Sequence, residues 1–157
     1  MPQLSSAPSG TPVTDVVCDA SIVLKWFHEE GEPGVEDARR LLAAHRSASI
    51  TAWVLDLTFY ELGNVLLRAV GWSAADVADQ LDDLRAICGV LALGAPEQRI
   101  AAGLAHEHAL TFYDAANVAA AQARGALLAT CDKALLDAGV GESAAALARR
   151  FGFSEAL

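Results

Sequence analysis

The 157-residue sequence predicts an α/β domain in which a mostly parallel central sheet is flanked by helices. Three observations lead to this prediction. Short runs of apolar, largely β-branched residues alternate with longer helical segments. Several helical segments begin or end at residues typical of helix ends, such as Ser73, Gly71 and Gly125. The chain is also 54% hydrophobic, which at this length is enough for one substantial core.

The first half of the chain supplies two predicted strands and three helices. Residues 14–18, "TDVVC", form a run of β-formers, and "ASIVLKWFH" at 20–28 continues it as a short helix. Residues 35–46 show the apolar spacing of an amphipathic helix. The second strand is "ASITAW" at 48–53, and the helix at 56–70 is ended by Gly71.

The second half repeats the alternation. Ser73 is a good N-cap for a helix at 73–87, and "GVLAL" at 89–93 is the third strand. Pro96 favours the start of a helix at 95–109. A helix at 114–125 ends at Gly125, the fourth strand is "ALLAT" at 126–130, and a short helix follows at 132–139. "ESAAALARRFGF" at 142–153 predicts a further helix, so no clear strand follows residue 137.

Composition and targeting signals limit the class of protein. Residues 1–13 are rich in Pro, Ser and Gly and predict a flexible tail, which leaves residues 14–157 as a single domain. The start lacks Lys, Arg and a long apolar run, so it is not a secretory signal. No apolar segment approaches the roughly 18 residues of a membrane span. Three cysteines cannot all pair, and without an export signal they predict reduced thiols in a cytoplasmic protein.

The net charge of −9 argues against a protein that coats nucleic acid through its backbone phosphates. The same charge is compatible with an acidic site that holds divalent cations, because bound ions change the local field.

Four carboxylates stand in contexts that suggest a site. Asp19 and Asp132 each follow a predicted strand, Asp114 opens a helix in "TFYDAAN", and Glu61 lies in an otherwise apolar helix. Each has a simpler interpretation. The three aspartates suit helix N-caps, and Glu61 suits either a capping box with Thr58 or a solvated polar stripe.

The joint pattern favours a metal site. Apolar residues followed by Cys and Asp occur twice, at Cys18-Asp19 and Cys131-Asp132. If the two strands are neighbours, about 5 Å apart, the carboxylates repel one another. A divalent cation removes that conflict, and a set of oxygen ligands indicates Mg²⁺ or Mn²⁺. Such ions activate water for phosphodiester hydrolysis without a nucleophilic side chain. Cys18 and Cys131 are predicted to be small buried strand residues.

At the motifs "VVCDASIVLKW", "YELGNVLLRA" and "LTFYDAANVAAAQARGALLATCDKALL" the sequence resembles the PIN-domain family, and within it the VapC toxins. The resemblance runs from residue 16 to about 137. It implies a PIN-like three-layer fold, a Mg²⁺- or Mn²⁺-dependent ribonuclease with RNA as substrate, a VapB-like antitoxin as partner, and a homodimer.

The same resemblance implies roles for individual residues. Asp19, Glu61, Asp114 and Asp132 match the family's four catalytic, metal-binding acids in order. Ser21 and Thr130 match hydroxyl residues that support the first and last acids. Asn117 departs from the aromatic or aliphatic residue that is common at its position, and is a further polar contact to the site.

Two other functions are compatible with parts of the sequence. A non-catalytic PIN-like binding module is the main alternative, since the acidic charge and the atypical C-terminal region allow it. The other is a phosphotransfer or phosphatase domain on a doubly wound sheet. A phosphatase of this kind needs an Asp-x-Asp pair after the first strand, but residue 21 is Ser. A phosphate-accepting domain needs an Asp at the end of the third strand, but "GVLALGAPE" contains none.

Overall fold

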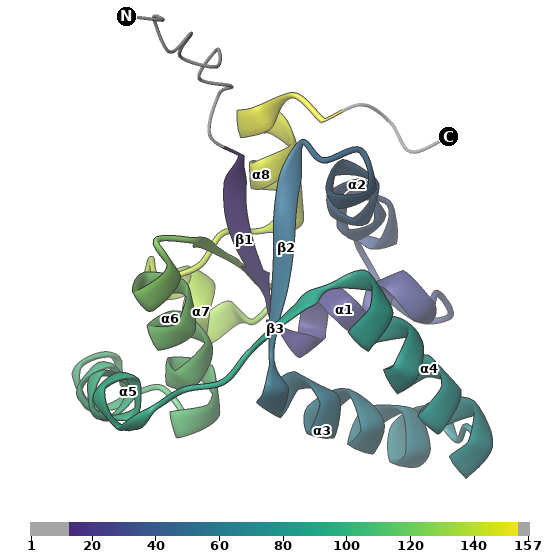
Figure 1. Ribbon diagram of the computed structural model, residues 1–157, viewed down its shortest axis with the longest axis horizontal. Helices are drawn as coiled ribbons and strands as arrows, with labels where there is room; N and C mark the ends of the chain where they lie inside the picture. Colours follow the sequence, from purple (N-terminus) through teal and green to yellow (C-terminus); the bar gives the residue numbers. More distant parts are fainter. Residues whose placement is uncertain (1–12, 154–157) are drawn as a thin grey trace, which may run out of the picture.

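The computed structural model describes residues 13–153 and shows a four-stranded, fully parallel sheet between two layers of helices (Figure 1). The strands are β1 (Thr14–Cys18), β2 (Ile50–Leu55), β3 (Gly89–Leu91) and β4 (Leu127–Ala129), in the order β3-β2-β1-β4. The predicted α/β, three-layer class is therefore confirmed. The predicted tail at 1–13 lies, except for Val13, outside the described residues.

Helices fill the connections as the sequence predicts. They are α1 (Ala20–Phe27), α2 (Val35–Arg46), α3 (Asp56–Val65) with the π-helical turn η1 (Leu66–Val70), α4 (Ala74–Ile87), α5 (Ala95–His108), α6 (Phe112–Arg124), α7 (Lys133–Asp137) and α8 (Ala144–Phe151). Ser73 caps α4 through the Asp76 N–H, and Gly71 ends η1 with a left-handed φ of 81°. Within residues 13–153 no helix is long and apolar enough to cross a membrane.

The alternation of side chains along β1 explains the three layers. Val16 and Cys18 belong to a core that includes residues of α1, α2, α3, α4 and α8. Val17, on the opposite face, packs in a second core with residues of α5, α6 and α7. All three side chains are fully buried, so β1 is covered on both faces, as expected for a central parallel strand.

The strand order creates a switch point between β1 and β4. The chain proceeds from β1 outward to β2 and β3, then crosses to the other side of β1 to form β4. Val16, Val17 and Cys18 pair in register with Leu127, Leu128 and Ala129. Ligands in such sheets bind beyond the carboxyl ends of the strands at this point, which is where Asp19 and Asp132 emerge.

The edge of the sheet beyond β4 is reduced to one bridge. Glu142 donates its N–H to the Leu128 carbonyl at 2.8 Å, and its own carbonyl accepts the Thr130 N–H at 3.0 Å. The chain then enters α8, which confirms the helix predicted near the C-terminus. Gly141 lies so close to the sheet that an added Cβ would be 2.7 Å from the Thr130 methyl group.

Candidate functional site

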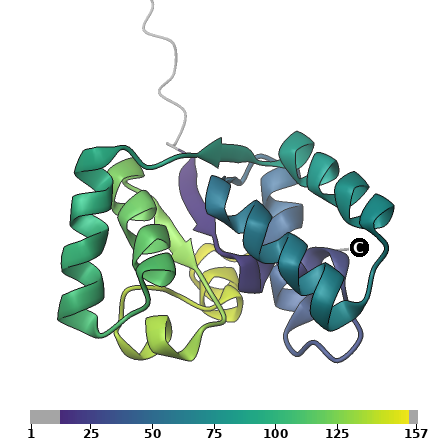
Figure 2. The ribbon, with the colours of Figure 1, turned by 90° about the horizontal axis from the view of Figure 1, so that it is seen from below.

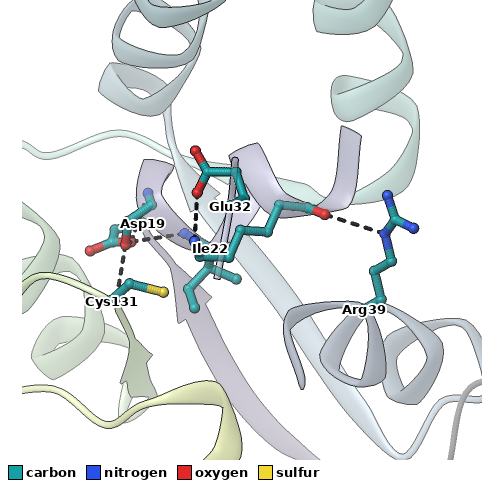
Figure 3. A network of polar contacts seen from close by, with 7 residues as sticks. Asp19, Ile22, Glu32, Arg39 and Cys131 are labelled. Atoms are coloured by element: carbon teal, nitrogen blue, oxygen red, sulfur yellow. Dashed lines mark hydrogen bonds and ion pairs between the residues drawn. The ribbon is translucent and has the colours of Figure 1, made fainter. Parts of the chain in front are cut away.

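Asp19 is buried at the junction of β1 and α1, with 6% of its surface exposed. It is the N-cap of α1: one carboxylate oxygen accepts the N–H groups of Ser21 at 3.0 Å and Ile22 at 3.3 Å, and the Ser21 hydroxyl donates to the same oxygen. Figure 3 shows Asp19 at the start of α1 with Cys131 from the end of β4 beside it. The capping interpretation is thus correct for Asp19, and it leaves open what else the carboxylate does.

Two hydroxyl groups tie the ends of β1 and β4 together. The Thr130 hydroxyl donates to the second oxygen of Asp19 and accepts the Asp132 N–H at 2.9 Å. The Ser21 hydroxyl accepts the Cys131 N–H at 2.8 Å. Thr130 is fully buried, so its two partners fix its rotamer. These two residues hold Asp19 and the chain at Asp132 in a fixed relation across the switch point.

The four predicted acids are electrostatically linked, and we call them together the acidic site. Burial raises the pKa of Asp19, which hydrogen bonds from Ser21 and Thr130 oppose. Burial also raises the pKa of Glu61, and the charges of Asp19 and Asp114 raise it further. The pKa of Asp114 is raised by burial and then by the charge of Asp132, while a hydrogen bond from Thr111 lowers it. The charge of Asp19 thus acts on Glu61, the charge of Asp114 acts on Glu61, and the charge of Asp132 acts on Asp114.

The helix-capping interpretations of Asp114 and Glu61 are wrong. Asp114 does not cap its helix, because the N-cap of α6 is Thr111, whose hydroxyl accepts the Asp114 N–H at 3.1 Å. Glu61 makes no capping box with Thr58, because α3 begins at Asp56 and the Thr58 side chain is fully buried with no partner for its hydroxyl. Asp132, in contrast, does cap α7 through the Ala134 N–H at 2.8 Å.

Two buried oxygens at the site lack hydrogen-bond partners. They are Oε1 of Glu61 and Oδ1 of Asn117, whose amide nitrogen donates to the Tyr113 carbonyl at 3.3 Å. Unpaired buried oxygens beside repelling carboxylates suit a hard divalent cation, which takes oxygen ligands and offsets negative charge. The chemistry of the donors therefore fits Mg²⁺ or Mn²⁺.

The carboxylates do not yet enclose an ion. Over the part of the chain that the structure describes, no three His, Cys, Asp or Glu side chains lie close enough together to coordinate one metal. Both oxygens of Asp19 also already accept hydrogen bonds. The four acids are thus connected through their charges, but their carboxylates do not lie at coordination distances from one ion.

Positive side chains near the acids have partners within the protein. Lys25 is buried and pairs with Glu32 at 2.6 Å, while its carbonyl accepts an N–H from Arg39 (Figure 3). Arg124 lies 3.6 Å above the Trp53 ring and 3.6 Å from Asp15.

Lys133 pairs with Asp137 one turn along the same helix. Cys131, predicted to be a buried strand residue, is exposed because β4 ends two residues earlier. The Lys25–Glu32 pair and the Thr111 cap were not predicted from the sequence, although a threonine three residues before an acid is a recognisable cap signal.

A sequence model of the PIN domain matches residues 16–141, most of the chain. The chain belongs to the PIN-domain family. This confirms the family predicted from the motifs around the four acids. A comparison with functionally curated proteins finds no match.

Solved structures of PIN-fold proteins superpose on most of the chain. PAE2754 from Pyrobaculum aerophilum is 24% identical with a TM-score of 0.64, covering 92% of this chain and 100% of that one. Mycobacterium tuberculosis VapC20, a sarcin-ricin loop cleaving toxin, is 19% identical with a TM-score of 0.65, covering 79% and 95%. VapBC2 from Rickettsia felis, bound to a promoter DNA fragment, is 12% identical with a TM-score of 0.64, covering 82% and 96%. At these identities the likeness concerns the fold.

Proposed function

We propose that this PIN-domain protein is a Mg²⁺- or Mn²⁺-dependent endoribonuclease and the toxin of a VapBC-like toxin–antitoxin pair. The observation that supports this most is the electrostatic linkage of Glu61 and Asp114 to Asp19 and Asp132, which lie beyond the carboxyl ends of β1 and β4. Like charges held together by a fold cost stability, so an arrangement of this kind is more typical of a functional site than of a structural one.

Each residue has a distinct part in the proposed site. Asp19, Glu61, Asp114 and Asp132 would hold the ion, which when bound lowers the pKa of a water and offsets charge on the phosphate. Ser21 and Thr130 orient the Asp19 carboxylate through their hydroxyl groups.

Asn117 offers the site its buried, unpaired amide oxygen. The Asn117 amide nitrogen is bound to the Tyr113 carbonyl, which fixes the direction in which that oxygen points.

The proposed partners follow from the fold relatives. VapC20 is described as a toxin that cleaves the sarcin-ricin loop, and another structure of similar fold, from Klebsiella pneumoniae, is a toxin–antitoxin complex. For this chain we accordingly propose RNA as substrate, a VapB-like antitoxin as inhibitor and a homodimer as the assembled form. An antitoxin that inserts a basic side chain among the four acids would offset their repulsion much as a cation does.

A second candidate is a PIN-like module that binds a partner or RNA without cutting it. It is favoured by the saturated hydrogen bonding of Asp19 and by the lack, among residues 13–153, of three metal-ligating side chains at coordination distance. Such a protein would keep its affinity for RNA but show no turnover with any divalent ion.

Cleavage of single-stranded RNA by the purified, antitoxin-free chain tests the proposal. We expect cleavage with Mn²⁺ or Mg²⁺, none with EDTA, and a loss of about 10²–10³-fold for Asp19→Asn, the range typical of removing one preorganised electrostatic group. The matched control is Asp82→Asn, which makes the same chemical change at an exposed position of α4 and should leave the rate unchanged. An inert wild type, or equal cutting by Asp19→Asn, would contradict the proposal.

A further inference from the structure

Two strongly exposed tyrosines stand directly beside acids of the site. Tyr60 on α3 has 77% of its surface exposed and precedes Glu61, and Tyr113 on α6 has 61% exposed and precedes Asp114. Tyrosine is usually at least half-buried because its ring is apolar. Packing within the described chain leaves most of both rings exposed, so both can contact a ligand.

Residues one helical turn from each tyrosine belong to, or pack against, the same buried cluster. Leu57 of α3 packs against a small buried cluster that contains Leu55 together with Ala116 and Ala120 of α6, which identifies the side of each helix that faces this cluster. Tyr60 lies one turn after Leu57, and Tyr113 lies one turn before Ala116, so each ring continues the facing side.

Figure 2, turned by 90° from the view of Figure 1, shows α3 and α6 on either side of β1. Glu61 is one helical position from Tyr60, and its pKa is raised by burial, by the charge of Asp19 and by the charge of Asp114, the neighbour of Tyr113. The acidic site therefore lies between the helices that carry the two rings.

Charge explains why rings rather than cations would hold a nucleic acid here. Phosphate contacts from Lys and Arg usually supply most of the affinity for nucleic acid. In this chain the net charge is −9, and Lys25, Arg124 and Lys133 are engaged with carboxylates of the protein itself, while the exposed Arg68 of η1 is a cation that can still contact phosphate. Stacking of a base on an aromatic ring needs no positive charge and contributes about 1–3 kcal/mol per base.

We propose that Tyr60 and Tyr113 are stacking platforms for two unpaired bases, one on each side of the phosphate that reaches the acidic site. This deepens the proposed nuclease function and rests on it. It names the substrate class as single-stranded RNA, because bases within a duplex have no free face to stack. The tyrosines bind and orient the strand, and they take no part in bond breaking.

The test measures binding of a short single-stranded RNA that carries 2-aminopurine at its centre, whose fluorescence falls when the base stacks. All variants also carry Glu61→Gln, which removes one acid of the site so that binding is measured without cleavage, and all samples contain Mg²⁺. We expect Tyr113→Ala and Tyr60→Ala each to weaken binding by about 5- to 150-fold, which is 1–3 kcal/mol at 1.4 kcal/mol per tenfold. Quenching should be lost with each alanine and retained with Tyr113→Phe and Tyr60→Phe.

The control Phe151→Ala removes an exposed ring from α8, which lies at the opposite end of the sheet from α3 (Figure 1). It should leave both affinity and quenching unchanged. A blunt duplex of the same sequence should bind more weakly than the single strand, and should respond little to loss of either tyrosine.

The outcomes separate this inference from the proposed function. Unchanged affinity and quenching in both alanine variants would overturn the proposal of stacking platforms. A change in oligomeric mass without a change in RNA affinity would also overturn it, because the rings would then belong to a protein interface. Cleavage by the wild-type chain is measured independently. Tyrosine-dependent quenching without any cleavage would leave the platforms standing and contradict the nuclease.

Discussion

Replacing Thr130 by valine removes two hydrogen bonds from the centre of the acidic site while nearly conserving the shape of the side chain. The Thr130 hydroxyl donates to Asp19 and accepts the Asp132 N–H at 2.9 Å. Thr58 provides a matched control, because it too is fully buried but its hydroxyl has no partner. The same chemical change at the two positions should therefore have opposite effects on stability.

The magnitudes follow from these contacts. A hydrogen bond to a charged group contributes about 1.5–3 kcal/mol, and the unpaired Asp132 N–H adds to that loss, so Thr130→Val should lower the free energy of unfolding by about 2–4 kcal/mol. For a domain of this size that is a fall in Tm of roughly 5–15 °C. Thr58→Val removes an unsatisfied buried hydroxyl and should be neutral or stabilising by up to about 1–2 kcal/mol.

The effect of Thr130→Val should also depend on pH. The hydroxyl stabilises the ionised form of Asp19 and so lowers its pKa, and its loss raises that pKa further. The destabilisation should then be smaller in acid, where Asp19 is protonated, than at neutral pH, and the acid limb of any cleavage rate should move to higher pH. In the proposed nuclease the rate itself should fall by about 10–100-fold.

Urea unfolding followed by tryptophan fluorescence and circular dichroism measures both variants under the same conditions. Equal free energies of unfolding for Thr130→Val and the wild type would refute the assignment of Thr130 as the link between the strand ends. Equal destabilisation by Thr130→Val and Thr58→Val would show that loss of any buried hydroxyl is costly here, and the specific role of Thr130 would fail.

Other parts of the fold give further predictions. The pKa of Glu61 is raised in the folded state, so the protonated side chain contributes stability at pH values below its ordinary pKa, and this contribution is lost as the pH rises through the folded-state pKa. Glu61→Gln should therefore be more stable than the wild type at neutral pH and should lose that advantage in acid. Tm measured against pH tests this. Lys25→Met leaves Glu32 half-buried without its cation and should cost about 1–3 kcal/mol in urea unfolding, less than for a fully buried pair, and the double replacement with Glu32→Leu should recover most of it. Gly141→Ala places a methyl group 2.7 Å from the methyl group of Thr130, so it should lower the free energy of unfolding by about 1–3 kcal/mol and reduce cleavage. Gly103→Ala, in open space within α5, should instead stabilise the protein by about 0.5–1 kcal/mol. Similar Tm shifts for the two variants would contradict this prediction.

Local chemistry allowed most elements to be predicted from the sequence. The run of β-formers ending at Cys18, the cap at Ser73 and the glycine at position 71 each act within a few residues, so they identify strands and helices without knowledge of the fold. Three of the acids, Asp19, Asp114 and Asp132, were identified in the same way, from their positions at the ends of such elements, whereas Glu61 was identified as the acid of an otherwise apolar helix.

Long-range geometry was beyond these local signals. The residues around Asp19 and Asp132 do not indicate that β1 and β4 are neighbours, because that pairing results from the path of the chain through β2 and β3. The expected roles of Asp114 and Cys131 depended on where an element begins or ends. The N-cap of α6 is Thr111, three residues before Asp114, and β4 ends two residues before Cys131, so Asp114 is not a cap and Cys131 is not a buried strand residue. The hydroxyl of Thr58 faces the core because of the packing of α3, which a capping pattern alone does not reveal.

Binding of Mn²⁺ to the purified chain, titrated calorimetrically at neutral pH, tests most directly the claim that the four acids form one divalent-cation site. We predict saturable binding to the wild type that is weakened at least about tenfold by each of Asp19→Asn, Glu61→Gln, Asp114→Asn and Asp132→Asn, and not by Asp82→Asn. An absence of binding to the wild type, or equal binding by the wild type and the Asp19 and Glu61 variants, would contradict the account.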